Sequence, residues 1–302
     1  MTNTVIALLL CTLGLSIHQI EGIMIKKYNS KHSKGGFIFT AILSLFAMLF
    51  FLIMDLITNR GGLNFPPQMI PYGIASGAFY CTASFSTYVA YRHGSYVLTN
   101  LFLSYALLFS VGYGIIYLKE MPGWIAYIGL ALMMVSIFLA RNTKKPAGDD
   151  SAKQPPKTSL LWVICVLLSL IGAGMFGVMQ KLQQVKFEKS CDNEFMIVTL
   201  GFSALAMLVI GLIKDGKDLP YILRHGCIPA GVAGMANGGA NLFNLITNAM
   251  LPISIVAPTR SGIKIIISFF IALVIFKEKL SKRQILGVIL GATALILLNL
   301  KI

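Results

Sequence analysis

Long apolar stretches recur along the whole chain, and they restrict its fold more than any other feature. The 302 residues are 56% hydrophobic and only 12% charged. A helix needs about 20 apolar residues to cross a bilayer. Residues 215–227 are polar enough to be a loop. We predict an all-α integral membrane protein with ten transmembrane helices, at about 4–25, 36–57, 69–91, 95–118, 122–140, 160–182, 194–214, 228–250, 253–276 and 283–300.

The positive charges gather on one side of this arrangement. The net charge is +14, but the Lys and Arg residues lie mostly in short loops between the predicted helices, which argues against nucleic acid as a partner. The side that holds the N-terminus carries six of them, and the opposite side carries seventeen. Because basic loops stay in the cytoplasm, we expect both termini outside the cell membrane. Short loops favour a bacterial inner membrane.

The two halves of the chain are similar to each other. Shifting the first half by 158 positions places Gly14 on Gly172 and Gly73 on Gly231, and the predicted helix boundaries coincide. We divide the chain into a first repeat (1–145), a polar linker (146–158) and a second repeat (159–302). Each repeat has five helices, an odd number, so the second must enter the membrane from the opposite side. The prediction is a pair of inverted repeats, as in many secondary transporters.

One segment in each repeat, at the end of the fourth helix, matches a segment at the same place in the other repeat. The two segments are "LKEMPGWIAYIG" (118–129) and "FKEKLSKRQILG" (276–287), and each has a Glu followed nine positions later by a Gly. With this pattern the chain resembles the EamA-like transporters of the drug/metabolite transporter superfamily. The resemblance implies a ten-helix bundle with a substrate held centrally between both halves. Glu120 and Glu278 themselves are interpreted as helix caps.

The known members of that superfamily carry amino acids, nucleotide sugars, sugar phosphates and drugs, so the resemblance leaves the substrate open. Members often have cytoplasmic termini, whereas the charge count here places both termini outside.

Arg260 and Lys264 lie four residues apart within the ninth apolar segment, where each charge costs roughly 2.5–3.5 kcal/mol. Three explanations compete. Arg260 reaches the headgroups while Lys264 pairs with Glu21, or the pair helps to couple a mobile cation, or both charges neutralise an anionic group of the substrate. Two fixed positive charges would repel a cation, which favours the third. Pro258 is expected to interrupt this helix and free backbone groups for the same ligand.

The eighth segment carries a column of amides. Their spacing of 4, 3 and 4 residues puts them on one helical face, where they either line a wet cavity or hold helices together. The column consists of Asn237, Asn241, Asn244 and Asn248.

Other polar side chains complete the candidate binding site. Glu21 is either a proton-coupling carboxylate or a residue at the headgroups. We expect His18 to be a packing residue and Tyr91 an anchor at the membrane interface. The remaining candidates for contact with a substrate are Tyr80, Ser84, Tyr88, Gln19 and Gln180.

These features predict a secondary, alternating-access transporter of a small organic metabolite with an anionic group. An exporter of lipophilic cations and a lipid flippase remain alternatives. Neither a cofactor nor a metal site is expected, because the five cysteines are scattered without metal-like spacing. The sequence also has no constellation of catalytic residues, so we do not expect an enzyme. The oligomeric state stays open.

Overall fold

The computed structural model describes residues 2–32, 34–58, 62–119, 123–140, 160–188, 191–277 and 282–299. Within these ranges every regular element is helical. The polar linker predicted at 146–158, and the two glutamates Glu120 and Glu278, lie outside the described residues.

The helices follow one another with short connections. They are α1 (Thr2–Lys31), α2 (Gly36–Thr58), α3 (Ile70–His93), α4 (Tyr96–Leu103), the 3-10 turn η1 (Ser104–Ala106), α5 (Leu107–Ile116), α6 (Trp124–Ala140), α7 (Leu160–Lys186), α8 (Asp192–Lys214), the 3-10 turn η2 (Gly216–Asp218), α9 (Leu219–Met250), α10 (Ile253–Val274) and α11 (Lys282–Asn299).

Four of the described helices, α1, α2, α7 and α8, are both long enough and apolar enough to span a bilayer by length and composition. The helices α3 and α9 are not among these four, and they carry the Tyr, Ser and Asn side chains singled out above. The apolar surface agrees with a lipid environment. Leu56 and Ile213 are 81% and 80% exposed, whereas Ser44 and Ser203 are buried and hydrogen-bonded to each other at 3.1 Å. The chain is an integral membrane protein of the helical class.

The backbone repeats with the same shift of 158 residues that relates the two halves of the sequence. After α5, the amides of Tyr117 and Leu118 both donate to the carbonyl of Tyr113. After α10, the amides of Ile275 and Phe276 both donate to the carbonyl of Ile271. The next residue in each half has a left-handed backbone, with φ of 54° at Lys119 and 50° at Lys277. The two halves therefore end their fourth apolar segments with the same local structure.

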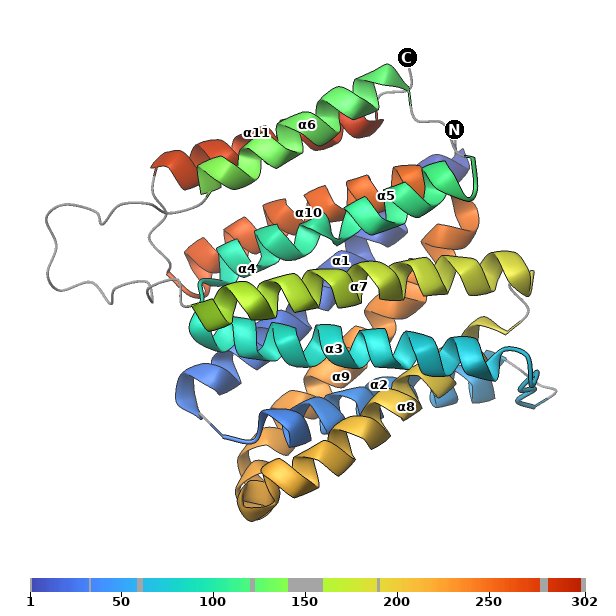
Figure 1. The fold of residues 1–302 in the computed structure, drawn as a ribbon, viewed down its shortest axis with the longest axis vertical. Coiled ribbons are helices and arrows are strands. Elements are labelled where there is room, and N and C mark those ends of the chain that lie inside the picture. The colour runs from blue at the N-terminus through green and yellow to red at the C-terminus, as the bar shows by residue number, and fades with distance from the viewer. Residues whose placement is uncertain are drawn as a thin grey trace, which may run out of the picture.

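Helices of the two halves pack against each other in matching pairs. In Figure 1, α6 lies beside α11 at one edge of the bundle, and α2 crosses α8 at the other. Between these edges α1 packs on α9, and α3 packs on α7. Exchanging the halves turns the first of these two pairs into the second, so the interface has an approximate two-fold relation.

Glycines allow the closest of these crossings. A methyl group added at Gly172 of α7 would lie 2.8 Å from the backbone nitrogen of Ala83 and 2.8 Å from the carbonyl oxygen of Phe79 in α3. At the matching Gly14 of α1, it would lie 2.6 Å from Cβ of Phe243 in α9. Small residues let membrane helices approach closely, and here they do so at repeat-related positions.

Three expectations about helix boundaries are wrong. The loop predicted at 215–227 is largely helical, because α9 already begins at Leu219. The fourth apolar segment is divided by the 3-10 turn at Ser104–Ala106. Pro258 does not interrupt its helix, since α10 is continuous from Ile253 to Val274. As the sixth residue of α10, Pro258 removes one backbone hydrogen bond, to the carbonyl of residue 254, but the helix continues through it.

We expect Gly172→Ala to destabilise the protein by about 1–3 kcal/mol, the usual cost of overpacking, since the backbone of α3 cannot move aside. The matched control is Gly112→Ala in α5, where an added methyl group meets nothing within 4 Å. The control should leave the thermal unfolding temperature in detergent unchanged or slightly higher. Equal melting temperatures for the two variants would contradict the packing that we describe.

Candidate functional site

A cavity of about 200 Å³ lies between the two halves, with walls formed by α1, α3, α4 and η1 of the first half and by α7, α9 and α10 of the second. Several of its lining residues are related by the 158-residue shift, which places the cavity on the approximate two-fold axis. The pairs are His18 and Phe176, Gln19 and Gly177, Gly22 and Gln180, Ala83 and Asn241, and Ala106 and Lys264.

Asn237 of α9 is the centre of a hydrogen-bond network on one wall. Its Oδ1 accepts from the hydroxyl of Tyr80 at 2.9 Å and from Nδ2 of Asn241 at 2.8 Å. Its own Nδ2 donates to Oε2 of Glu21 at 2.8 Å. Gln180 extends the network from α7, because its Nε2 donates to Oδ1 of Asn241 at 3.3 Å. The network ties α1, α3, α7 and α9 together.

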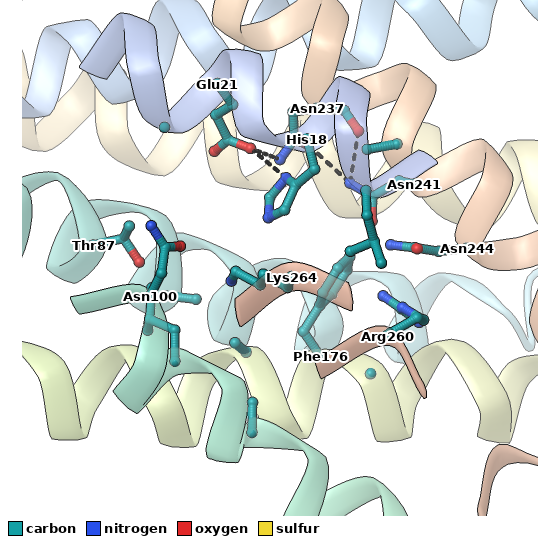
Figure 2. A pocket seen from close by; sticks show the side chains of 18 of the residues that line it. His18, Glu21, Thr87, Asn100, Phe176, Asn237, Asn241, Asn244, Arg260 and Lys264 are labelled. Carbon is teal, nitrogen blue, oxygen red and sulfur yellow. Dashed lines mark hydrogen bonds and ion pairs between the residues drawn. The ribbon is translucent and has the colours of Figure 1, made fainter. Parts of the chain in front are cut away.

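The amide column thus serves both predicted purposes. Asn237 and Asn241 line the cavity and also hold helices together, and Asn244 lines it as well (Figure 2). Asn248 does not reach the cavity. It is buried one turn further on, where its carbonyl oxygen accepts a hydrogen bond from Nζ of Lys181 at 2.9 Å.

Glu21 lies in the cavity wall and is only 7% exposed, so its alternative position at the headgroups is wrong. The carboxylate is 2.9 Å from Nδ1 of His18. His18 is a cavity residue and not the packing residue that we expected. In Figure 2 both side chains come from α1 and meet Asn237 at one point of the wall.

Arg260 and Lys264 line the cavity from α10 and are partly buried. Figure 2 shows that both side chains come from α10, while Asn244 and Asn100 belong to other parts of the cavity wall. Among the residues that the structure describes, neither cation has a carboxylate within ion-pairing distance. Glu21 instead meets His18 and Asn237, so the predicted Lys264–Glu21 pair is not formed in this conformation.

The charges of the cavity do not balance. Within the described part of its wall, Arg260 and Lys264 supply two fixed positive charges, and Glu21 supplies the one carboxylate. These residues belong to one half each, because their counterparts after the 158-residue shift are Phe102, Ala106 and Met179. An excess of positive charge between apolar walls attracts anions.

The remaining candidates divide between the cavity and the protein interior. Gln19, Gln180, Tyr80 and Ser84 line the cavity. Tyr88 does not. It packs in a buried apolar cluster around Phe39 and Tyr96 instead, with ring centroids 5.3 Å apart for Tyr88 and Phe39.

Sequence reasoning missed four polar residues of the wall and misplaced two more, His18 and Tyr91. Tyr91, expected at the membrane interface, is buried in the wall and donates to Oδ1 of Asn100 at 2.9 Å. The repeat offers a signal that could have found Asn100 and Ser104. Both lie within two turns before Ala106, which is the counterpart of Lys264 in the first half. The residues that we did not select are Thr87, Asn100, Ser104 and Ser261.

The fold and the cavity together define a class of protein: a helical membrane protein of two similar halves with a polar, electropositive chamber between them. Comparison with known families agrees with this description. The model of the EamA-like transporter family matches residues 160–300. The second half of the chain is therefore similar to the EamA-like transporters of the drug/metabolite transporter superfamily, the resemblance that the paired Glu–Gly segments indicated. The family is one of transporters and not of enzymes.

Other comparisons bear on the fold alone. One solved crystal structure is 14% identical, covers 96% of this chain and 95% of its own, and superimposes with a TM-score of 0.59. No match was found among the curated proteins.

We expect Asn237→Leu to lower the free energy of unfolding by about 1–3 kcal/mol, because it removes the buried hydrogen bonds that Asn237 makes to Glu21 and Tyr80. Asn244→Leu is the matched control. Asn244 lies on the same face and lines the same cavity, but within the described structure its side chain makes no hydrogen bond. Thermal unfolding in detergent should separate the two variants, and the same loss in both would disprove the central role of Asn237.

Proposed function

We propose that this chain is an alternating-access carrier of a small organic metabolite with an anionic group. The observation that carries the proposal is the pair Arg260 and Lys264, which line the cavity without a carboxylate partner among the described residues. A guanidinium group presents two parallel N–H donors to a carboxylate or a phosphate, and the ammonium group adds a second charge. A bound anion would compensate charges that the protein leaves unpaired.

The architecture that we propose has ten spans in two inverted five-helix repeats. The matching helix ends at Lys119 and Lys277 support the repeat, and so does the cavity at the junction of both halves. In such carriers one bundle rocks against the other about a central site, which opens to each face in turn. Glu21 is the candidate for proton coupling, because it is the carboxylate of the described wall and it contacts a histidine.

The size and charge of the cavity weigh against the alternatives. Drug-sized ligands usually occupy pockets of about 300–1,000 Å³, which is larger than the 200 Å³ available here. Two fixed positive charges also disfavour a lipophilic cation. A lipid flippase would require a lateral opening large enough for a headgroup.

We expect small organic anions to raise the melting temperature of the purified protein, and Arg260→Ala and Lys264→Ala each to weaken that binding about 10- to 100-fold. This loss corresponds to hydrogen bonds with charged groups. The panel contains monocarboxylates, dicarboxylates, amino acids and sugar phosphates, with tetraphenylphosphonium as the lipophilic cation. Lys217→Ala, which removes one exposed positive charge at η2, should change nothing.

The alternative function makes the opposite prediction. Three results together would identify a cation exporter. Tetraphenylphosphonium would stabilise the protein, Glu21→Gln would abolish this stabilisation, and Arg260→Ala would leave it unchanged. The anion hypothesis would also be wrong if anions bound equally well to the wild type, to Arg260→Ala and to Lys264→Ala.

We further propose that both termini face outward from a bacterial inner membrane. A tag at the C-terminus should then be cleaved by protease added to intact spheroplasts, while a tag within the basic segment 141–157 should be protected. Cleavage of the tag in segment 141–157 alone would show that the orientation is the reverse of the one that we propose.

A further inference from the structure

Three aromatic rings pack against one another beside the cavity. Tyr91 lines the cavity, and its ring stacks on Tyr96, with centroids 5.2 Å apart and planes inclined by 15°. Phe276 packs on the other side of Tyr96 with centroids 5.0 Å apart. Tyr96 is completely buried. The rings come from the end of α3, the start of α4 and the turn after α10, so they lie at the end of the bundle that carries the loops after α1 and α3.

The repeat-related positions at the opposite end carry no aromatic residues. The 158-residue shift relates Tyr91, Tyr96 and Phe276 to Ala249, Ser254 and Leu118. A duplication would have supplied equivalent positions at both ends, so the aromatic residues belong to one face only. Lys26 fastens this end further, because its Nζ donates to the carbonyl oxygens of Tyr91 and Gly94 where α3 ends.

Gln19 connects these rings to the cavity. Its Oε1 accepts from the hydroxyl of Tyr96 at 2.6 Å and from Oγ of Ser268 at 3.3 Å. Its Nε2 is buried and has no hydrogen-bond partner in the described structure. The residue is only 3% exposed, and it lines the cavity. A buried donor without a partner is costly, and a ligand oxygen in the cavity would satisfy it.

The free donor lies close to the proposed anion site. Ser268 and Lys264 are four residues apart on α10, so they share a face about one helical turn apart. Gln19, which is bonded to Ser268, therefore contacts α10 one helical turn from the position of Lys264. The amide is planar, so a substrate oxygen bound to Nε2 also determines where Oε1 points, and with it the bond to Tyr96.

We propose that Tyr91, Tyr96 and Phe276 form a gate at this end of the cavity, and that Gln19 is the positioning residue through which the bound substrate releases it. The proposal rests on the carrier function proposed above. With the cavity empty, Gln19 holds the Tyr96 hydroxyl and the gate stays closed. An anionic oxygen that binds Nε2 reorients the amide, weakens the bond to Tyr96 and allows the rings to separate.

The test measures gate opening without any ligand. Val97, buried in the same apolar cluster, is replaced by Cys in a background carrying Cys227→Ser, since Cys227 is the half-exposed native cysteine. Maleimide labelling of residue 97 is followed by mass spectrometry. We expect Tyr96→Phe, which keeps the ring and removes the bond, to raise the labelling rate about 2- to 12-fold. Gln19→Met should do the same.

Two controls separate gating from general loosening of the fold. Tyr88→Phe removes a hydroxyl in the same cluster that has no partner in the described structure, so it should leave the labelling rate unchanged. Native Cys191 is buried in a different apolar cluster, and its labelling should stay constant in every variant.

A double variant decides whether the effect passes through the Gln19–Tyr96 bond. If it does, Gln19→Met combined with Tyr96→Phe labels no faster than either single variant. Additive rates, equal labelling in Tyr96→Phe and Tyr88→Phe, or a parallel rise at Cys191 would each overturn the proposal. Because no ligand is used, this outcome is independent of anion binding by Arg260 and Lys264, so either hypothesis can fail alone.

Discussion

Hydrocarbon cannot hydrogen-bond, and this constraint accounts for most of the structure. Each polar side chain within the bundle must find a partner in the protein or face water. Asn237 meets this demand with bonds to Tyr80, Asn241 and Glu21. The network needs contributions from several helices, so it fixes their relative positions and leaves a polar chamber where they meet. Structure and binding site therefore depend on the same bonds.

The two halves share local structure but differ in their chemistry. The helix ends at Lys119 and Lys277 have kept the same backbone, and the glycines at positions 14 and 172 still mark matching crossings. At the chamber, however, the charged residues of one half correspond to apolar residues of the other half. Lys264, for example, corresponds to Ala106. The residue differences between the two halves give the chamber its excess of positive charge.

The same divergence gives the chamber two unlike ends. Stacked rings around Tyr96 occupy one end, while the corresponding positions at the other carry smaller side chains. An equal pair of gates would not favour either conformation. In the gate that we propose, one aromatic cluster, bonded through Gln19 to the chamber, biases the empty protein towards being closed at that face.

The sequence by itself determined the helical membrane class, the resemblance to the EamA-like transporters and the presence of two charges in an apolar helix. These features depend on local composition and periodicity, which the chain carries without reference to its neighbours. It also led to Asn237 and Asn241, because a helical spacing is readable along one element. Only the tertiary structure decided that Glu21 meets His18 and not Lys264, that Tyr88 packs in an apolar cluster, and that Gln19 bonds Tyr96. Those outcomes depend on how separate helices are rotated and placed against one another, and no single helix encodes that placement.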